Sequence, residues 1–134
     1  MDRAHQRAAE RIARATETPA SADALYERVL AELARVLDFD GACWHVSDPL
    51  SAVPVRGGGV GHPPGDFERS VEFEFLTADV LRFDELARRG RPVGTIAQET
   101  RGRPRESPRY REMIEPEGGA DELRAAFADR FGVW

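Results

Sequence analysis

The residue types best suited to chemistry stand at Cys43 and His45, in the segment FDGACWHVS. On an extended strand, side chains two positions apart face the same side, so the thiol and the imidazole would lie together as a nucleophile and its base do. Neighbours on one strand face usually pack against each other instead, and no third group that would orient the imidazole can be identified. We therefore predict no catalytic residues, and a protein that is not an enzyme.

A second chemical motif is the segment RGRPR, formed by Arg101, Gly102, Arg103, Pro104 and Arg105. It resembles an AT-hook, whose arginines follow a narrow A·T minor groove. The motif occurs once, acidic residues flank it, and the formal net charge of -5 makes the whole chain repel phosphate. DNA binding by Arg101 to Pro104 is therefore a minor alternative, and we expect no direct nucleic-acid contact.

Composition removes several other classes of site. All 19 basic residues are arginine, which excludes the lysine of a P-loop, of a Schiff base or of a kinase strand. One cysteine allows no internal disulfide, and with three scattered histidines it offers no zinc spacing, so we predict no metal and no cofactor. The glycines of RGGGVGHPPG fit no phosphate-binding motif and predict a flexible loop. No apolar run is long enough to cross a membrane, which predicts a cytoplasmic protein.

The N-terminal elements that would support these residues are two helices. RAHQRAAERIARAT places alanines on one side and an arginine stripe, expected to face solvent, on the other, so residues 1–20 are predicted to form a separate N-terminal helix. Pro19 and Ala20 mark a break, and Ser21 is a good N-cap for a second helix. Its apolar ridge runs to Leu37 and should face a core.

In the central part of the chain, some segments show the two-residue period of a strand and others the 3.6-residue period of a helix. Residues 42–46 alternate as in a strand, and the turn residues after them predict an antiparallel hairpin whose second strand lies near Ala52 to Val55. Over 67–75 the apolar pattern fits a strand and a helix equally well. A helix is predicted from Thr77, as its cap, to Gly90, with Asp79 in the first turn.

The C-terminal part predicts one short helix and further strands. Ser107 and Pro108 form an N-cap and N1 pair that should begin a helix over SPRYREMI. Leu123, Ala125 and Phe127 then alternate as in a strand. The chain ends on the apolar segment FGVW, which looks like the start of another strand.

The order of FDGACW, SDP, FDELARRGRPVGT, SPRYRE and DELRAAF resembles the N-terminal GAF-like sensory domain of actinobacterial LuxR-type transcriptional regulators, from about Phe39 to Trp134. The resemblance implies an α+β fold in which an antiparallel sheet is flanked by helices, over residues 21–134. It also implies that 67–75 is helical and that 121–127 pairs with a strand beginning near Val133. In that family the sheet continues and a DNA-binding helix-turn-helix follows, so the chain is expected to be a fragment of a regulator or a truncated gene product.

Sensing is then the expected function. A cavity lined by Trp44, Phe75, Phe83 and Tyr110 would take a small-molecule effector and bias an output domain. The same aromatic residues could equally be plain core, because regular aromatic spacing mainly supplies buried area. The chain is also expected to be a homodimer that uses its N-terminal helices, and a stand-alone interaction or dimerisation domain is the alternative function.

Overall fold

A computed structural model describes residues 2–18, 21–61 and 66–133. The α+β class predicted from the sequence is confirmed, since helices alternate with three two-stranded sheets among these residues. The chain divides into two compact units, Met1–Trp44 with Gly58–His62 and His45–Gly57 with Pro63–Trp134. Predictions on Pro19, Ala20, His62 and Trp134 lie outside the described residues.

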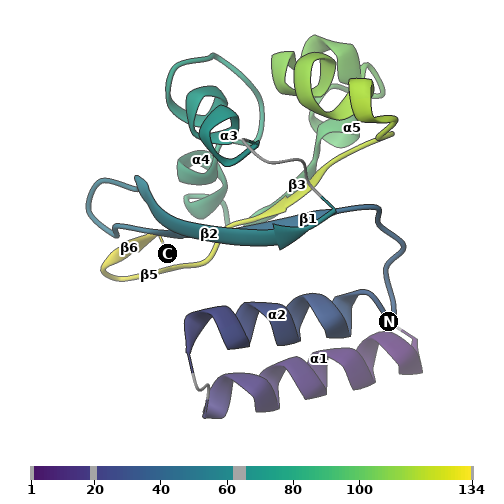
Figure 1. The fold of residues 1–134 in the computed structure, drawn as a ribbon, viewed down its shortest axis with the longest axis vertical. Helices are drawn as coiled ribbons and strands as arrows, with labels where there is room; N and C mark the ends of the chain where they lie inside the picture. Colours follow the sequence, from purple (N-terminus) through teal and green to yellow (C-terminus); the bar gives the residue numbers. More distant parts are fainter. Residues whose placement is uncertain (1, 19–20, 62–65, 134) are drawn as a thin grey trace. The chain divides into compact units, whose positions relative to one another are not determined.

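The first unit contains the two predicted N-terminal helices, α1 (Arg3–Glu17) and α2 (Ala22–Leu33), which lie side by side in Figure 1. Asp2 caps α1 by accepting from two backbone N–H groups, and Ser21 caps α2 as predicted. Ala8 and Ala15 are buried, which lets the helices approach closely. The arginine stripe is not wholly solvated, because Arg11 Nε donates to Glu32 Oε2 of α2 at 2.5 Å.

The predicted ridge of α2 is only half-buried. Regular helix ends at Leu33 and irregular turns follow, so the helix is shorter than the apolar pattern indicated. No residue of α2 is fully buried, and Leu37 at the end of the ridge is exposed. The apolar face of α2 therefore keeps a surface that this unit does not cover.

Strands β1 (Ala42–Ser47) and β2 (Pro54–Val60) pair in one sheet, joined by a turn that Asp48 holds. Its Oδ1 accepts from Leu50 N, Ser51 N and Ser51 Oγ, as the turn chemistry predicted. The prediction of a flexible glycine loop is wrong for residues 56–60, which belong to β2, while residues 62–65 of that segment lie outside the described residues.

The glycines of β2 are there for close approach rather than for flexibility. A Cβ on Gly58 would lie 2.8 Å from Cζ2 of Trp44, and a Cβ on Gly59 would lie 2.4 Å from the carbonyl oxygen of Ala42. Only glycine lets the strand pass this near the Trp44 ring and the backbone of β1.

The second unit begins with α3 (Asp66–Phe75), which confirms that 67–75 is helical. The helix predicted from Thr77 is wrong in its first half, since α4 spans only Phe83–Ala87. Leu81 has a φ of 59°, which no right-handed helix contains. Asp79 does not occupy a first turn but accepts hydrogen bonds from Ser107 and Arg109, far along the chain.

The remaining elements are β3 (Val93–Thr95), α5 (Ile96–Glu99), three short helices and three strands. The short helices are the 3₁₀ helices η1 (Pro104–Glu106) and η3 (Glu115–Glu117) and the π-helix η2 (Tyr110–Ile114), and the strands are β4 (Leu123–Ala125), β5 (Ala128–Asp129) and β6 (Gly132–Val133). Ser107 Oγ accepts from Tyr110 N, so the predicted N-cap is confirmed.

The predicted partner of the 121–127 strand is wrong. β4 pairs antiparallel with β3, with Gly94 opposite Arg124, and it is β5 that pairs with β6. Ala126 N also donates to Pro92 O, which extends the β3–β4 pairing. The core of this unit consists of Leu81, Leu86, Ile96, Tyr110 and Ala126. In the part of the chain that is described, no helix is long and apolar enough to cross a membrane.

Candidate functional site

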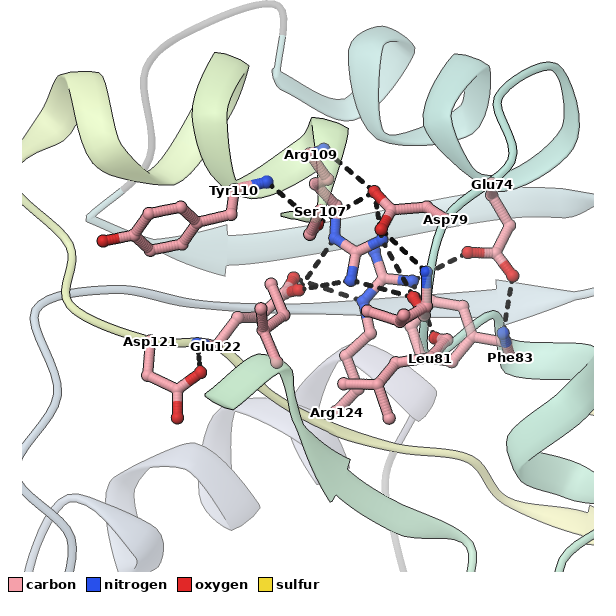
Figure 2. Close-up of polar contacts among 12 residues, drawn as sticks. Glu74, Asp79, Leu81, Phe83, Ser107, Arg109, Tyr110, Asp121, Glu122 and Arg124 are labelled. Atoms are coloured by element: carbon pink, nitrogen blue, oxygen red, sulfur yellow. Dashed lines mark hydrogen bonds and ion pairs between the residues drawn. The ribbon is translucent and has the colours of Figure 1, made fainter. Parts of the chain in front are cut away.

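Two arginines and three carboxylates meet in the interior of the second unit (Figure 2). We call this cluster the ionic network; its members are Glu74, Asp79, Arg109, Glu122 and Arg124. They come from α3, from the segment before α4, from the start of η2 and from β4 and the residue before it. The network therefore joins four parts of the unit that are distant in sequence.

Arg109 is the most deeply placed cation, with 2% of its side chain exposed. Its Nε donates to Glu122 Oε2 at 2.8 Å, and Nη1 lies 3.5 Å from Asp79 Oδ2. Its guanidinium also reaches the carbonyl oxygen of Val80 at 3.4 to 3.5 Å. A guanidinium with donors directed at several oxygens can be buried without leaving its charge unpaired.

Arg124 lies beside it and shares Glu122, whose other oxygen accepts from Arg124 Nε at 3.2 Å. Arg124 Nη1 donates to Glu74 Oε2 at 2.7 Å, and the guanidinium carbon lies 4.5 Å from the centre of the Phe83 ring. Burial acts to lower the pKa of Arg124, but the charges of Glu122 and Glu74 outweigh it and raise the pKa above its ordinary value. Arg124 is thus a permanent cation, packed between two carboxylates and an aromatic face.

Asp79 accepts hydrogen bonds from the residues that precede η2. Its Oδ2 accepts from Ser107 Oγ at 3.0 Å and from Arg109 N at 2.8 Å, while Ser107 Oγ accepts from Tyr110 N. A carboxylate at this place complements the positive end of a helix and satisfies its free N–H groups. The Ser-Pro pair that predicted a helix start therefore acts together with an aspartate nearly thirty residues away.

Chemically, the ionic network is a set of mutually satisfied charges. Three carboxylates face two guanidinium groups, and every buried side-chain nitrogen or oxygen among the described residues has a hydrogen-bond partner. Such networks position elements, because moving one member leaves a buried charge without its partner. The arrangement is suited to holding α3, α4, η2 and β4 in one geometry.

Cys43 and His45, the two residues first considered for catalysis, lie in different environments. His45 is half-buried, with its ring edge-to-face against Phe67 and Phe83 at 5.0 and 6.1 Å between centroids. Burial first, and then the charge of Arg124, lower the pKa of His45 to about 4. Cys43 is exposed. The imidazole is therefore a neutral packing group near pH 7.

The four aromatic residues predicted to line a cavity are only partly brought together. Tyr110 belongs to the core of the second unit, Phe83 is partly buried against that core, and Phe75 is half-buried in α3. Trp44 is in the first unit, stacked on Tyr26 at 4.6 Å with 7° between the ring planes. None of the four lines the surface hollow beside α4 or the smaller one over residues 34–38. The aromatic pocket stays a prediction.

The hook-like segment is a compact turn at the end of α5. Arg101 and Gly102 both have positive φ, 52° and 79°, and Gly102 N donates to Ala97 O. Arg103 pairs with Glu106 at 3.0 Å, and Pro104 begins η1. Two left-handed residues in succession close a helix, whereas tracking a groove calls for extended backbone.

The ionic network was not predicted from the sequence. One signal in the sequence could have indicated it. Arg124 lies between apolar residues in LRAAF, so it falls in a strand with a buried face, where a charged residue needs a partner. Among the described residues, no cluster of three or more His, Cys, Asp or Glu side chains could hold a metal ion. No protein family, curated protein or solved structure matches the chain.

Proposed function

We propose that the chain is a non-enzymatic, GAF-like sensory or regulatory domain of a LuxR-type transcriptional regulator. The observation that carries this proposal is that three of the five segments on which the resemblance rests meet at the ionic network. SPRYRE contributes Arg109, DELRAAF contributes Glu122 and Arg124, and FDELARRGRPVGT contributes Phe83 beneath the Arg124 guanidinium. Their meeting at one interior site supports the proposal that these three segments belong to one structural unit.

The proposed role also fits the mechanical character of the site. Glu74 Oε1 accepts from Phe83 N at 2.6 Å at the start of α4, while its Oε2 binds Arg124 of β4. A shift of α4 therefore disturbs a buried ion pair at once. A sensory domain needs an element of this kind, which can occupy two positions whose populations a ligand shifts.

The test begins with the coding sequence that follows Trp134 in frame. A helix-turn-helix there would support the proposal, and its absence would favour a free-standing domain. In a regulator so completed, Arg124→Met should change transcription from its target promoter while the protein remains folded by circular dichroism. Unchanged transcription in a folded Arg124→Met regulator would contradict the proposed transmission.

The second candidate, a stand-alone dimerisation domain, is favoured by the state of α2. Its apolar ridge is half-buried with no fully buried residue, and an amphipathic helix gains stability mainly by covering such a face. Sedimentation equilibrium of the purified chain tests this candidate. A dimer weakened by Leu37→Glu, and unaffected by Leu76→Glu in the other unit, would favour it; a monomer would exclude it.

A further inference from the structure

A hollow of about 370 Å³ opens on the second unit beside α4; we call it the α4 hollow. Its walls are the turn after β1, with Pro49 and Leu50, the end of α4 with Ala87 and the following Arg88, and the hairpin residues Ala128, Asp129 and Gly132. Its volume falls within the range that small-molecule sites occupy. None of the aromatic residues predicted to bind an effector contributes to it.

The walls of the α4 hollow are held by close contacts. A Cβ on Gly132 would lie 1.8 Å from the carbonyl oxygen of Pro49, so only glycine permits this approach of the β5–β6 hairpin to the turn. Asp48 braces the other side of the same turn through Ser51. A hollow between segments fixed in this way is largely pre-formed.

The lining of the α4 hollow contains both apolar and charged residues. Most of the lining residues are apolar, while Arg88 stands at the rim with 70% of its side chain exposed. One of its five N–H groups donates to Asp84 Oδ2 at 3.0 Å, and the structure of the described residues gives it no other acceptor. The remaining donors suit an acidic group. Asp84 in the same lining is also paired with Arg82 at 3.3 Å, and the carboxylate of Asp129, which accepts from Phe131 N, disfavours more than one negative charge.

On the basis of the proposed regulatory function, we infer that the α4 hollow is an effector site for a small organic monoanion with an apolar body, such as an aromatic carboxylate or sulfonate. Its anionic group pairs with Arg88 and its rings cover Pro49, Leu50 and Ala128. The same helix carries the signal inward. Phe83, at the start of α4, packs under Arg124 and donates its N–H to Glu74, so an occupant of the hollow acts on the ionic network through one turn of helix.

The test uses 8-anilinonaphthalene-1-sulfonate, an aromatic monoanion that fluoresces on leaving water. We expect saturable binding to the folded chain, with amide chemical-shift changes at residues 48–52, 84–89 and 128–132 and, through α4, at Phe83 and its contacts Glu74 and Arg124. Arg88→Gln should weaken binding about tenfold, as loss of a charge-assisted hydrogen bond does. Arg105→Gln is the matched control, because Arg105 is equally exposed and also pairs with one carboxylate, Glu115, outside the hollow.

A second pair of variants tests the apolar wall. Leu50→Asp should weaken binding, and Leu76→Asp should not, although both leucines are highly exposed. Shift changes that spare residues 48–52, 84–89 and 128–132, no binding, or equal binding by the Arg88 and Arg105 variants would overturn the site. Because the regulatory proposal is tested by transcription from a promoter, loss of the site would leave it standing. If the probe bound at the hollow but the protein had no effect on transcription, the regulatory proposal would be contradicted and the binding site would stand.

Discussion

Glu74 illustrates how much one side chain of the ionic network does. One of its oxygens accepts from Phe83 N and the other from Arg124, and the carboxylate is itself almost fully buried. Removing it leaves a buried cation with one partner fewer and takes the carboxylate partner from the partly buried N–H of Phe83. Such losses cost far more than the net contribution of the intact pair, because desolvation is no longer compensated.

We therefore expect Glu74→Ala to lower the free energy of unfolding by about 3 kcal/mol or more. Urea denaturation followed by circular dichroism measures this. Glu115→Ala is the control, since Glu115 pairs with the exposed Arg105 and should cost less than about 1 kcal/mol. Equal losses from the two substitutions would show that the network gains nothing from its burial.

His45 should make stability depend on pH. Its pKa in the folded chain is about 4, below its ordinary value of 6.5, so between these values the unfolded chain binds the extra proton. Stability is then complete above about pH 6.5 and is lost as the pH falls towards 4, by up to about 3 kcal/mol. His45→Phe keeps an aromatic ring against Phe67 and Phe83 and should remove this loss.

The measurement is the urea midpoint of both proteins between pH 4 and 7. His5→Gln serves as the control, because His5 is exposed on α1 and pairs only with Asp2 at the helix start. If His45→Phe and the parent chain lost stability in parallel below pH 6.5, the imidazole would not be the group responsible.

At the scale of elements, β4 shows that alternation predicts a strand without identifying its buried face. Leu123, Ala125 and Phe127 alternate as in a strand, yet Leu123 and Phe127 are exposed while Arg124 and Ala126 are buried. The two-residue period locates a strand, but only the hydropathy of the residues indicates which of its two faces is buried. Hydropathy misleads when the buried group is an arginine whose partners come from other elements.

The helix predicted from Thr77 failed for a related reason. Thr77 and Asp79 are good capping residues, and the apolar spacing after them is helical. The structure uses Asp79 for Ser107 and Arg109 instead, and Arg124 Nη1 donates to Leu81 O in the left-handed turn. A long-range ionic contact thus overrides a local signal, and no property of the segment itself indicates this.

The glycines of β2 provide a test at the same scale. Gly59→Ala would place a methyl group 2.4 Å from Ala42 O, so the paired strands must separate. We expect a loss of about 1–3 kcal/mol in the free energy of unfolding. Gly90→Ala should change it by less than about 0.5 kcal/mol, because nothing lies within 4 Å of a Cβ there. Thermal denaturation of both variants decides; a tolerated Gly59→Ala would mean that β1 and β2 pair more loosely.

For the whole molecule, the residue patterns predicted the α+β class, the helices α1 and α2, the turn at Asp48 and the cap at Ser107, and the family resemblance implied the helix α3. It misplaced the pairing of β4 and did not identify the ionic network. The difference is physical. Caps, turns and helix periods depend on residues within one or two turns, whereas strand partners and ion pairs are chosen by contacts such as Arg124 with Glu74, fifty residues apart.

DNA binding is the last property that belongs to the molecule as a whole. Affinity for a duplex comes largely from neutralising phosphates, and a chain with a net charge of -5 repels them. The RGRPR segment could oppose this only locally, and there Arg103 is paired with Glu106 while the backbone of Arg101 and Gly102 is folded into a turn. We expect no retardation of an A·T-rich duplex in a low-salt gel, and no difference between the chain and Arg103→Ala. Retardation that Arg103→Ala abolishes would instead show that this turn opens to enter a minor groove.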